Sequence, residues 1–399
     1  MKEVFFIMTY IDRMRLFVLF LMKKYLFNRF DINVEKNDTL DLKPPYLLLS
    51  NHTNNWDPFL INILLDKPIT YVTNIEFFRK KSTRYLLKFA GAIPIVKFMK
   101  GTSTIKKIIE AKKDKKIIGI FPEGRRNWDG ETEEIIYSTA KLVKLLKIPV
   151  ITTTLKGAHL SYPRWAKYGR WGKIDVSLEK ILDRKRIANL SVDEIYDITN
   201  KKLYYNEYSY QKKEKNKYKG KKLAEDLELL LFTCPNCKDI GVMESKDDKL
   251  YCKNCSYHVK YNELGFFESN DKLYFNNPVK WNKWQLDFLS NIIKNAKDEY
   301  IIKEKEVELF QIKDNKIKKV ASGNLFLKKD YLYFVSNNNY SIKFNLTNLG
   351  GLNIQYNKIL EFFYADDIYR FKFPPKKSPF KWLKSVEISQ KYSEEVCYG

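Results

Sequence analysis

The sequence predicts an α/β protein whose core is a mostly parallel sheet covered by helices, followed by a small cysteine-bearing insert and a β-rich C-terminal region. Between residues 44 and 180, short apolar stretches alternate with stretches of helical periodicity. After residue 300, strand-like stretches follow one another without helices between them. With 399 residues, 44% of them hydrophobic, the chain is long enough for two or three domains with cores of their own.

The first element along the chain is an apolar stretch with basic flanks. Leu16–Met22 reads LFVLFLM, preceded by Arg13 and Arg15 and followed by two lysines. The stretch is shorter than the roughly 20 residues that span a bilayer, and no small-residue cleavage site follows it, as one would in a signal peptide. We therefore expect residues 1–35 to form an amphipathic helix in the membrane interface; a helix packed on the domain is the alternative.

Residues 36–228 are expected to form the α/β domain. Its strand candidates are short, rich in Ile and Val and without polar alternation, as strands buried on both faces should be. Apolar residues at helical spacing indicate intervening helices around Ile105–Ile109 and Leu142–Leu146. The strand candidates are Tyr46–Ser50, Thr70–Thr73, Ala92–Val96, Ile117–Phe121, Val150–Leu155 and Lys173–Leu178.

A histidine and an acid follow the first of these strands. His52 is one of only three histidines, and Asp57 lies five positions after it. An imidazole at a strand end with a carboxylate in reach can remove a proton from an alcohol. Each residue also has a structural interpretation: Asp57 followed by Pro58 is a typical helix N-cap, and His52 could be a hydrogen-bonded core residue.

A second polar segment follows the strand Ile117–Phe121. The sequence Phe-Pro-Glu-Gly ends at Gly124 and is followed by Arg125 and Arg126. Such a junction offers backbone amides and guanidinium groups at the place where an α/β sheet binds its ligand, although a plain polar turn would look the same. A third segment, Gly91–Lys97, is a strand with a cation at its end.

These segments, in this order, resemble the glycerophospholipid acyltransferase family of the 1-acylglycerol-3-phosphate type. The NHxxxxD block is intact at Asn51, His52 and Asp57, and the FPEG block is intact at residues 121–124. The GxIxIxR block appears as Gly91–Lys97, with lysine in place of arginine, and Ile148–Thr154 loosely matches a fourth block. The resemblance covers about residues 40–200, so it implies the fold of that family for the α/β domain.

The resemblance also implies an activity. His52 would be the general base on the hydroxyl of a lysophospholipid, most closely 1-acylglycerol-3-phosphate giving phosphatidic acid, and Asp57 would orient the imidazole. The acyl donor would be a thioester of acyl carrier protein or of coenzyme A. Another lysophospholipid acceptor stays open, because a lysine lacks the fork with which arginine grips a phosphate. The residues expected to position the substrate's phosphate are Lys97, Glu123, Gly124, Arg126 and, as the weaker candidate, Arg125.

Four of the five cysteines form two CxxC pairs separated by fourteen residues. Pairs at this spacing predict a closed, structural four-cysteine zinc site, and hence a zinc ribbon over residues 229–265, in a reducing compartment. His258 is an alternative ligand, and Cys397 is expected to be a free thiol. The predicted ligands are Cys234, Cys237, Cys252 and Cys255.

Residues 300–395 are expected to form a β-rich domain after a helical linker at 266–299. The strand candidates are separated by Asn, Asp and Gly turns, and the chain closes with an amphipathic helix at Pro379–Val386. Several strands followed by one helix is the order of pleckstrin-homology-like domains, a resemblance that rests on topology alone. The strand candidates are Val307–Phe310, Asn324–Leu327, Tyr331–Val335 and Ile359–Phe363.

The charge of the chain favours an anionic partner. Lysine and arginine outnumber aspartate and glutamate by 72 to 48, which gives a formal net charge of +24. With the apolar N-terminal stretch, this charge leads us to expect a peripheral, monotopic protein on an anionic membrane surface, at its cytoplasmic face. A nucleic-acid-binding zinc-ribbon protein is the alternative, but it leaves the NHxxxxD and FPEG blocks unexplained, so we do not expect nucleic acid as a partner.

Overall fold

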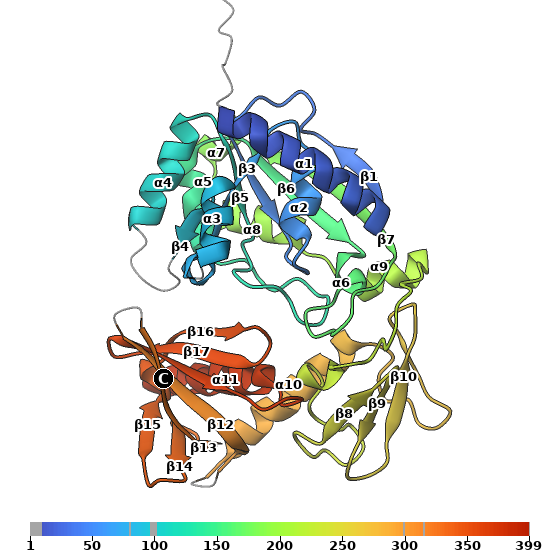
Figure 1. The fold of residues 1–399 in the computed structure, drawn as a ribbon, viewed down its shortest axis with the longest axis vertical. Coiled ribbons are helices and arrows are strands. Elements are labelled where there is room, and N and C mark those ends of the chain that lie inside the picture. The colour runs from blue at the N-terminus through green and yellow to red at the C-terminus, as the bar shows by residue number, and fades with distance from the viewer. Residues whose placement is uncertain (1–9, 80, 96–101, 298–299, 314–315, 399) are drawn as a thin grey trace, which may run out of the picture. The chain divides into compact units, whose positions relative to one another are not determined.

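The computed structural model describes residues 10–79, 81–95, 102–297, 300–313 and 316–398, and the chain divides into two compact units (Figure 1). The first unit comprises residues 1–164 and 169–220, and the second comprises residues 165–168 and 221–399. This division is coarser than the five domains expected from the sequence, whose boundaries stay predictions.

The first unit is built on a seven-stranded sheet. Its strands are β1 (Asp31–Asn37), β2 (Tyr46–Ser50), β3 (Ile69–Asn74), β4 (Ile93–Ile95), β5 (Ile117–Ile120), β6 (Val150–Lys156) and β7 (Lys173–Leu182). They lie in the order β1-β7-β6-β2-β5-β3-β4. Strands β2 to β6 run parallel to one another, whereas β7 is antiparallel to β6 and pairs in parallel with β1. The mostly parallel sheet predicted from the sequence is therefore confirmed.

Strand β1 was not among the predicted strands. Its sequence, DINVEKN, contains no apolar run, and five of its seven residues are exposed. An edge strand of this kind is held by its hydrogen bonds to β7 rather than by burial, so hydrophobic periodicity does not reveal it.

Helices cover both faces of the sheet, as predicted (Figure 1). The alternation of side chains along β2 makes the two cores. Leu47 and Leu49 belong to one core, and Tyr46 and Leu48 belong to the other. Buried side chains of α4 (Thr102–Lys113), α5 (Ser138–Leu146), α7 (Arg184–Asn189) and α8 (Val192–Leu203) fill the first core, and those of α1 (Tyr10–Arg29) and α2 (Asp57–Asn62) help to fill the second.

The central position of β2 decides where a ligand site can form. Strand β2 lies between β5 and β6 and runs parallel to both, so the three carboxyl ends meet at one edge of the sheet. The loops that leave this edge begin at Asn51, Phe121 and Gly157. This is the edge at which open α/β sheets bind their ligands.

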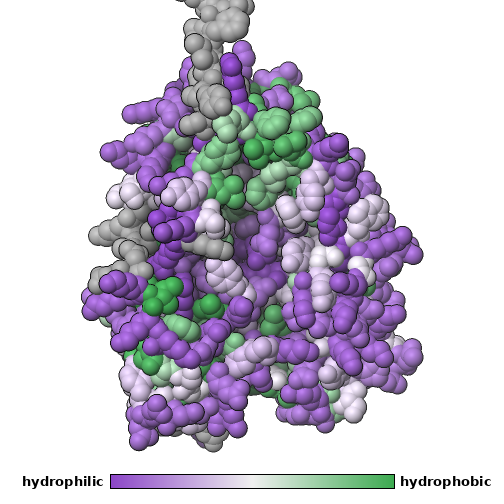
Figure 2. Space-filling model, in the orientation of Figure 1, coloured by the Kyte–Doolittle hydropathy of each residue, from purple (hydrophilic) through white to green (hydrophobic). Residues whose placement is uncertain are grey.

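Helix α1 leaves large apolar side chains in contact with solvent. Figure 2 shows hydrophobic residues gathered in the region of α1, and Phe17, Phe20 and Leu21 are 63%, 67% and 53% exposed. Leu26 at its C-terminal end is fully buried and ties the helix to the second core. Among the described helices, none combines the length and the hydropathy that crossing a bilayer requires.

The second unit contains two antiparallel sheets and two long helices. The strands are β8 (Met243–Lys246), β9 (Lys249–Cys252), β10 (His258–Tyr261), β11 (Phe267–Glu268), β12 (Ile302–Lys313), β13 (Lys316–Leu327), β14 (Tyr331–Ser336), β15 (Ser341–Asn345), β16 (Gly350–Gln355), β17 (Ile359–Tyr364) and β18 (Asp367–Lys372), and the helices are α10 (Pro278–Asn295) and α11 (Pro379–Tyr398). One sheet has the order β11-β10-β9-β8, and the other has the order β15-β14-β13-β12-β18-β17-β16. Helix α11 packs on α10, β16 and β17.

The antiparallel C-terminal strands predicted from the sequence are confirmed, but the domain has more of them. Strands β15, β16 and β18 were not predicted, because β15 is largely exposed, β16 begins with two glycines, and β18 mixes charged and apolar residues. The C-terminal helix is also longer than predicted, since α11 continues to Tyr398. The pleckstrin-homology-like assignment stays a prediction.

Replacing Gly119 of β5 by alanine should destabilise the first unit. An added Cβ would lie 2.6 Å from Ile69 Cγ2 and 2.6 Å from Tyr71 Cδ1, and over-packing a core costs about 1–3 kcal/mol. We expect a lower Tm in thermal unfolding followed by circular dichroism. Gly169→Ala is the matched control in the same unit, because the nearest atom to its added Cβ is the movable end of the Arg29 side chain. Equal Tm values for both variants would contradict the tight packing at Gly119.

Candidate functional site

His52 lies at the carboxyl edge of the sheet with its ring held on two sides. Nδ1 is 2.8 Å from Asp57 Oδ2, and the ring stacks on Phe121, with ring centroids 4.1 Å apart and planes at 25°. Because a carboxylate accepts, Nδ1 carries the proton and Nε2 is the basic atom. The side chain of His52 is 21% exposed. The geometry thus fits a general base that solvent or a substrate can reach.

Asp57 is not the N-cap of α2. The helix begins at Asp57 itself, after Trp56, and no side chain caps it. The fully buried carboxylate turns back to the preceding loop, where Oδ2 accepts hydrogen bonds from the amides of Thr53 at 2.6 Å and Asn54 at 2.9 Å. The Thr53 hydroxyl donates to Oδ1 at 3.2 Å. The alternative interpretation of Asp57 as a helix N-cap is therefore wrong, because its oxygens accept hydrogen bonds from the preceding loop and from the imidazole instead.

The backbone of His52 is also fixed at both of its polar groups. Its N–H donates to Glu123 Oε1 at 2.7 Å, and its C=O accepts from the amide of Asn127 at 2.9 Å. The other oxygen of Glu123 accepts from the amide of Glu133 at 3.0 Å. Burial raises the pKa of the Glu123 carboxyl well above its usual value, although both amides favour the ionised form. Glu123 thus joins the loops after β2 and β5, and its expected role at the substrate's phosphate stays a prediction.

The turn after β5 presents two arginines that differ in their surroundings. Gly124 has φ +69°, and a Cβ there would lie 2.6 Å from Ile136 Cδ1, so the turn requires glycine. The Arg125 guanidinium is paired with Glu133, with Nη2 and Oε2 2.8 Å apart. The guanidinium of Arg126 has no hydrogen bond or ion pair with any residue that the structure describes. Arg126 is therefore better placed than Arg125 to bind an anion.

Two asparagines fasten the histidine loop to β6 and to the short helix α6 (Ala158–Ser161). The Asn51 amide exchanges hydrogen bonds with the backbone of Leu155, donating at 3.1 Å and accepting at 2.9 Å. Asn54 Nδ2 donates to the carbonyl of Ala158 at 2.7 Å. From the sequence, Asn51 was recognised as part of the NHxxxxD block, but no role was predicted for it. Nothing in the sequence pointed to Asn54.

The surroundings of His52 favour the neutral form of its imidazole. Burial lowers the pKa of His52, Asp57 acts in the opposite direction, and Arg126 and Arg164 lower the pKa further. An imidazole with its pKa below the usual 6.5 is unprotonated at neutral pH, as a base must be. Sequence reasoning missed Arg164, because no motif surrounds it. Lys97, the remaining predicted phosphate ligand, lies outside the described residues.

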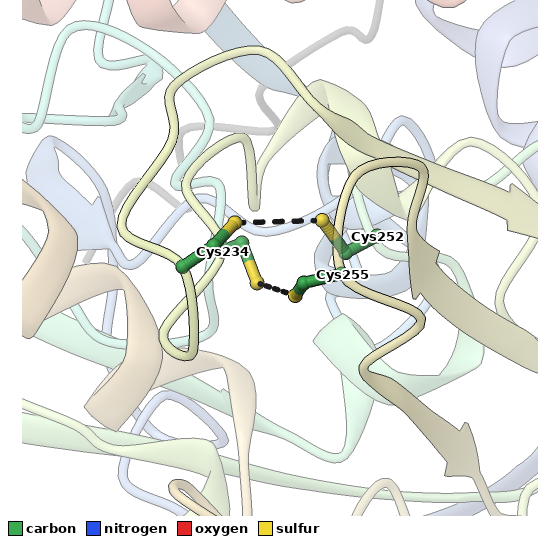
Figure 3. A group of neighbouring side chains, drawn as sticks. Cys234, Cys252 and Cys255 are labelled. Carbon is green, nitrogen blue, oxygen red and sulfur yellow. Dashed lines mark hydrogen bonds between the residues drawn. The ribbon is translucent and has the colours of Figure 1, made fainter.

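The four cysteines of the second unit come together at one point. Figure 3 shows the side chains of Cys234, Cys252 and Cys255 directed toward a common centre from two loops. All four sulfur atoms lie within 4.8 Å of one another, and the Cys234–Cys255 and Cys237–Cys252 Sγ pairs are 3.6 Å and 3.7 Å apart. A zinc ion with Zn–S bonds of about 2.3 Å sets tetrahedral edges of about 3.8 Å. The four thiols therefore fit a tetrahedral zinc site, and the presence of zinc stays a prediction.

The structure places only one of the two further residues that the sequence singled out, His258. His258 is exposed, and its Nδ1 lies 3.2 Å from the carbonyl of Ser256. It is not a member of the cysteine cluster, so the candidate ligand set consists of the four thiols. The side chain of Cys397 lies outside the part of the chain that the structure describes.

The purified protein should contain about one zinc ion per chain, measured by inductively coupled plasma mass spectrometry. Cys237→Ser should lower the zinc content and the thermal stability, because a structural zinc contributes directly to folding. Cys397→Ser serves as the control and should keep the zinc. A well-folded wild-type protein without zinc would refute the assignment.

The match to a family model lies within the first unit. Residues 31–156 match the model of the family described as Acyltransferase. The 1-acyl-sn-glycerol-3-phosphate acyltransferase of Saccharomyces cerevisiae is 24% identical over 183 residues, which cover 43% of this chain and 57% of the relative. This chain thus spans little more than half of the length of that relative.

A solved structure, the 1-acyl-sn-glycerophosphate (LPA) acyltransferase PlsC from Thermotoga maritima, aligns with a TM-score of 0.41 and 16% identity, over 50% of this chain and 83% of that chain. The family match contains every residue predicted for catalysis and for phosphate binding, and it contains neither Arg164 nor the four cysteines. Residues 31–156 are therefore similar in sequence to the acyltransferase family, and they carry the His52–Asp57 pair.

Proposed function

We propose that this protein transfers a fatty acyl group from a thioester of acyl carrier protein or coenzyme A to the free hydroxyl of a lysophospholipid. The expected acceptor is 1-acylglycerol-3-phosphate, which would become phosphatidic acid. The observation that carries the proposal is the His52–Asp57 pair, in which Nδ1 and Oδ2 are 2.8 Å apart and the imidazole stays partly exposed. The match of residues 31–156 to acyltransferases supports the same reaction.

The reaction needs no covalent intermediate on the protein. His52 Nε2 takes the proton of the acceptor hydroxyl while its oxygen attacks the thioester carbonyl. Asp57 holds the ring in the tautomer with Nδ1–H and stabilises the imidazolium that forms. When the tetrahedral intermediate collapses, the C–S bond breaks, and the leaving thiolate takes the proton from His52. The products are the acylated phospholipid and the free thiol of the donor.

The phosphate of the acceptor has a suitable partner beside the base. The Arg126 guanidinium lies close enough to affect the charge of the His52 imidazole, and a planar guanidinium can bind a phosphate with two parallel hydrogen bonds. Lys97 is expected to add a second cation, and the backbone amide of Gly124 is another candidate donor. Arg125 contributes less in this proposal, because Glu133 already neutralises its charge.

Loss of the base should cost about 10²–10⁴-fold in kcat, the range of a positioned general base. We expect this loss for His52→Ala, and a comparable loss for Asp57→Asn, which keeps the shape of the side chain but favours the wrong tautomer. The assay measures release of free thiol from acyl-coenzyme A or acyl-carrier protein with lysophosphatidic acid as acceptor. His258→Ala is the control histidine variant, since His258 lies in the other unit. Turnover near the wild-type rate by folded His52→Ala would end the proposal.

A protein that acylates a lysophospholipid must reach the surface of a bilayer. Helix α1 offers exposed aromatic side chains at Phe17, Phe20 and Tyr25 beside the basic residues Lys23 and Lys24. Aromatic rings at headgroup depth and lysines near anionic phosphates are the usual elements of an interfacial helix. We therefore propose that α1 holds the protein on the cytoplasmic face of an anionic membrane.

Phe17→Gln combined with Phe20→Gln should weaken binding to vesicles of phosphatidylglycerol and phosphatidylcholine by about tenfold or more, because a buried phenylalanine is worth about 1.5–3 kcal/mol. Co-sedimentation measures the bound fraction. The control is Leu40→Gln combined with Leu145→Gln, which removes two exposed apolar side chains of the same unit outside α1. Equal losses for the two double variants would contradict a specific role of α1.

A further inference from the structure

Arg164 is a buried cation close to the candidate active site. Its side chain is 6% exposed. The guanidinium lies over the ring of Trp128, with 4.5 Å between Cζ and the ring centroid, and Trp128 is itself 1% exposed. Placing a guanidinium in such surroundings costs desolvation energy that an apolar side chain over the same ring would not cost. Packing alone therefore does not explain why an arginine, rather than an apolar residue, occupies this position.

The hydrogen bonds of Arg164 lead to the backbone of His52 in two steps. Arg164 Nη1 donates to the carbonyl of Arg126 at 2.7 Å. The N–H of the same peptide bond belongs to Asn127, and it donates to the carbonyl of His52 at 2.9 Å. The peptide between Arg126 and Asn127 is thus bound at both ends. Since a peptide is planar, fixing its carbonyl also fixes the direction of its N–H.

The same peptide carries the proposed phosphate ligand. The Cα of Arg126 is bonded to the carbonyl carbon that Arg164 holds, so this hydrogen bond restrains the position of the Cα from which the Arg126 side chain extends. A shift of about 1 Å in a group that positions a substrate can cost about 10²-fold in rate. Through this one peptide, Arg164 can therefore affect the positions of both His52, the proposed base, and Arg126, the proposed partner of the substrate's phosphate.

Four ionisable groups act on His52 or contact it. Asp57 is bound to its ring, Glu123 is bound to its backbone amide, and Arg126 and Arg164 act on it through space. Asp57 favours the protonated ring, whereas the two arginines favour the neutral ring by lowering the pKa of His52. Burial of the ring is the largest effect that lowers the pKa of His52, and the two arginines add to it, so that the carboxylate can orient the ring without protonating it.

We infer that Arg164 is a positioning residue of this site: packed against Trp128, it holds the Arg126–Asn127 peptide in its hydrogen bond with His52. The inference rests on the proposed function where it concerns rate. The contact geometry and the protonation of His52 are properties of the folded chain, so they can be measured whether or not acyl transfer is found.

Two variants separate the charge of Arg164 from its shape. Arg164→Gln removes the charge, and Arg164→Lys keeps it but loses the planar group that covers Trp128. The protonation of His52 is followed by NMR of the full chain with ¹³C-labelled histidine, in which three signals are expected and His52→Gln assigns one of them. The turnover assay described above is run on the same proteins.

Arg164→Gln should raise the pKa of His52 and lower kcat by about tenfold or more. Arg164→Lys should leave the pKa of His52 near the wild-type value and still lower kcat. Arg170→Gln is the control, because Arg170 is a buried arginine of the same unit, 2% exposed, whose Nη1 donates to the carbonyl of Leu160. It should leave the His52 signal unchanged, and the His258 signal should not move in any variant.

The inference is overturned if folded Arg164→Gln shows the wild-type pKa of His52, or if Arg170→Gln moves that pKa equally. Full turnover by Arg164→Lys would overturn the positioning role. If the wild-type protein shows no acyl transfer with any donor and acceptor, the proposed function fails, and the NMR titration still decides whether Arg164 acts on His52. If Arg164→Gln does not fold, two other variants test whether Arg164 positions the peptide: Arg164→Lys, and Arg164→Lys combined with Trp128→Phe. A loss of kcat in these variants is expected and supports the inference.

Discussion

The loop after β2 is organised by a carboxylate that has no exposed surface. Removing a carboxylate from water costs several kcal/mol unless other hydrogen bonds replace its hydration. For Asp57 these replacements are the amides of Thr53 and Asn54, the Thr53 hydroxyl and the ring of His52. The loop must curl around the acid to bring these donors together. The orientation of the imidazole therefore follows from the solvation of Asp57, and it does not need to be imposed by a bound substrate.

The same principle joins the neighbouring loop. Glu123 is also buried, and its two oxygens accept from the amides of His52 and Glu133. The site is thus held mainly by bonds between carboxylates and main-chain amides, which depend on the path of the chain. That path requires a left-handed residue at Gly124, where a side chain would strike Ile136. Rigid placement of a base and a cation at the end of parallel strands fits the acyl transfer that we propose.

The sequence was sufficient to predict those features for which the local residue pattern agrees with the burial in the folded protein. The strand Tyr46–Ser50 was predicted with its observed bounds, because a five-residue apolar run buried on both faces leaves little room for another structure. The sequence also predicted His52 and Asp57 as a pair, which the structure brings into hydrogen-bonding distance. It could not distinguish a helix cap from a loop acid at Asp57, since both begin with Asp-Pro and differ only in the direction of the side chain. Arg164 could not be predicted from the sequence, because its partners lie nearly forty residues away in the chain.

The edge of the first sheet has a further consequence. Strand β1 occupies this edge with a β-bulge between Val34 and Lys36, and it carries exposed acidic and basic side chains. An open strand edge can pair with the edge of a second molecule and start aggregation, and charged side chains and bulges oppose that pairing. The polar sequence of β1, which prevented its prediction as a strand, is therefore also the property that opposes pairing of this edge with the sheet of a second molecule.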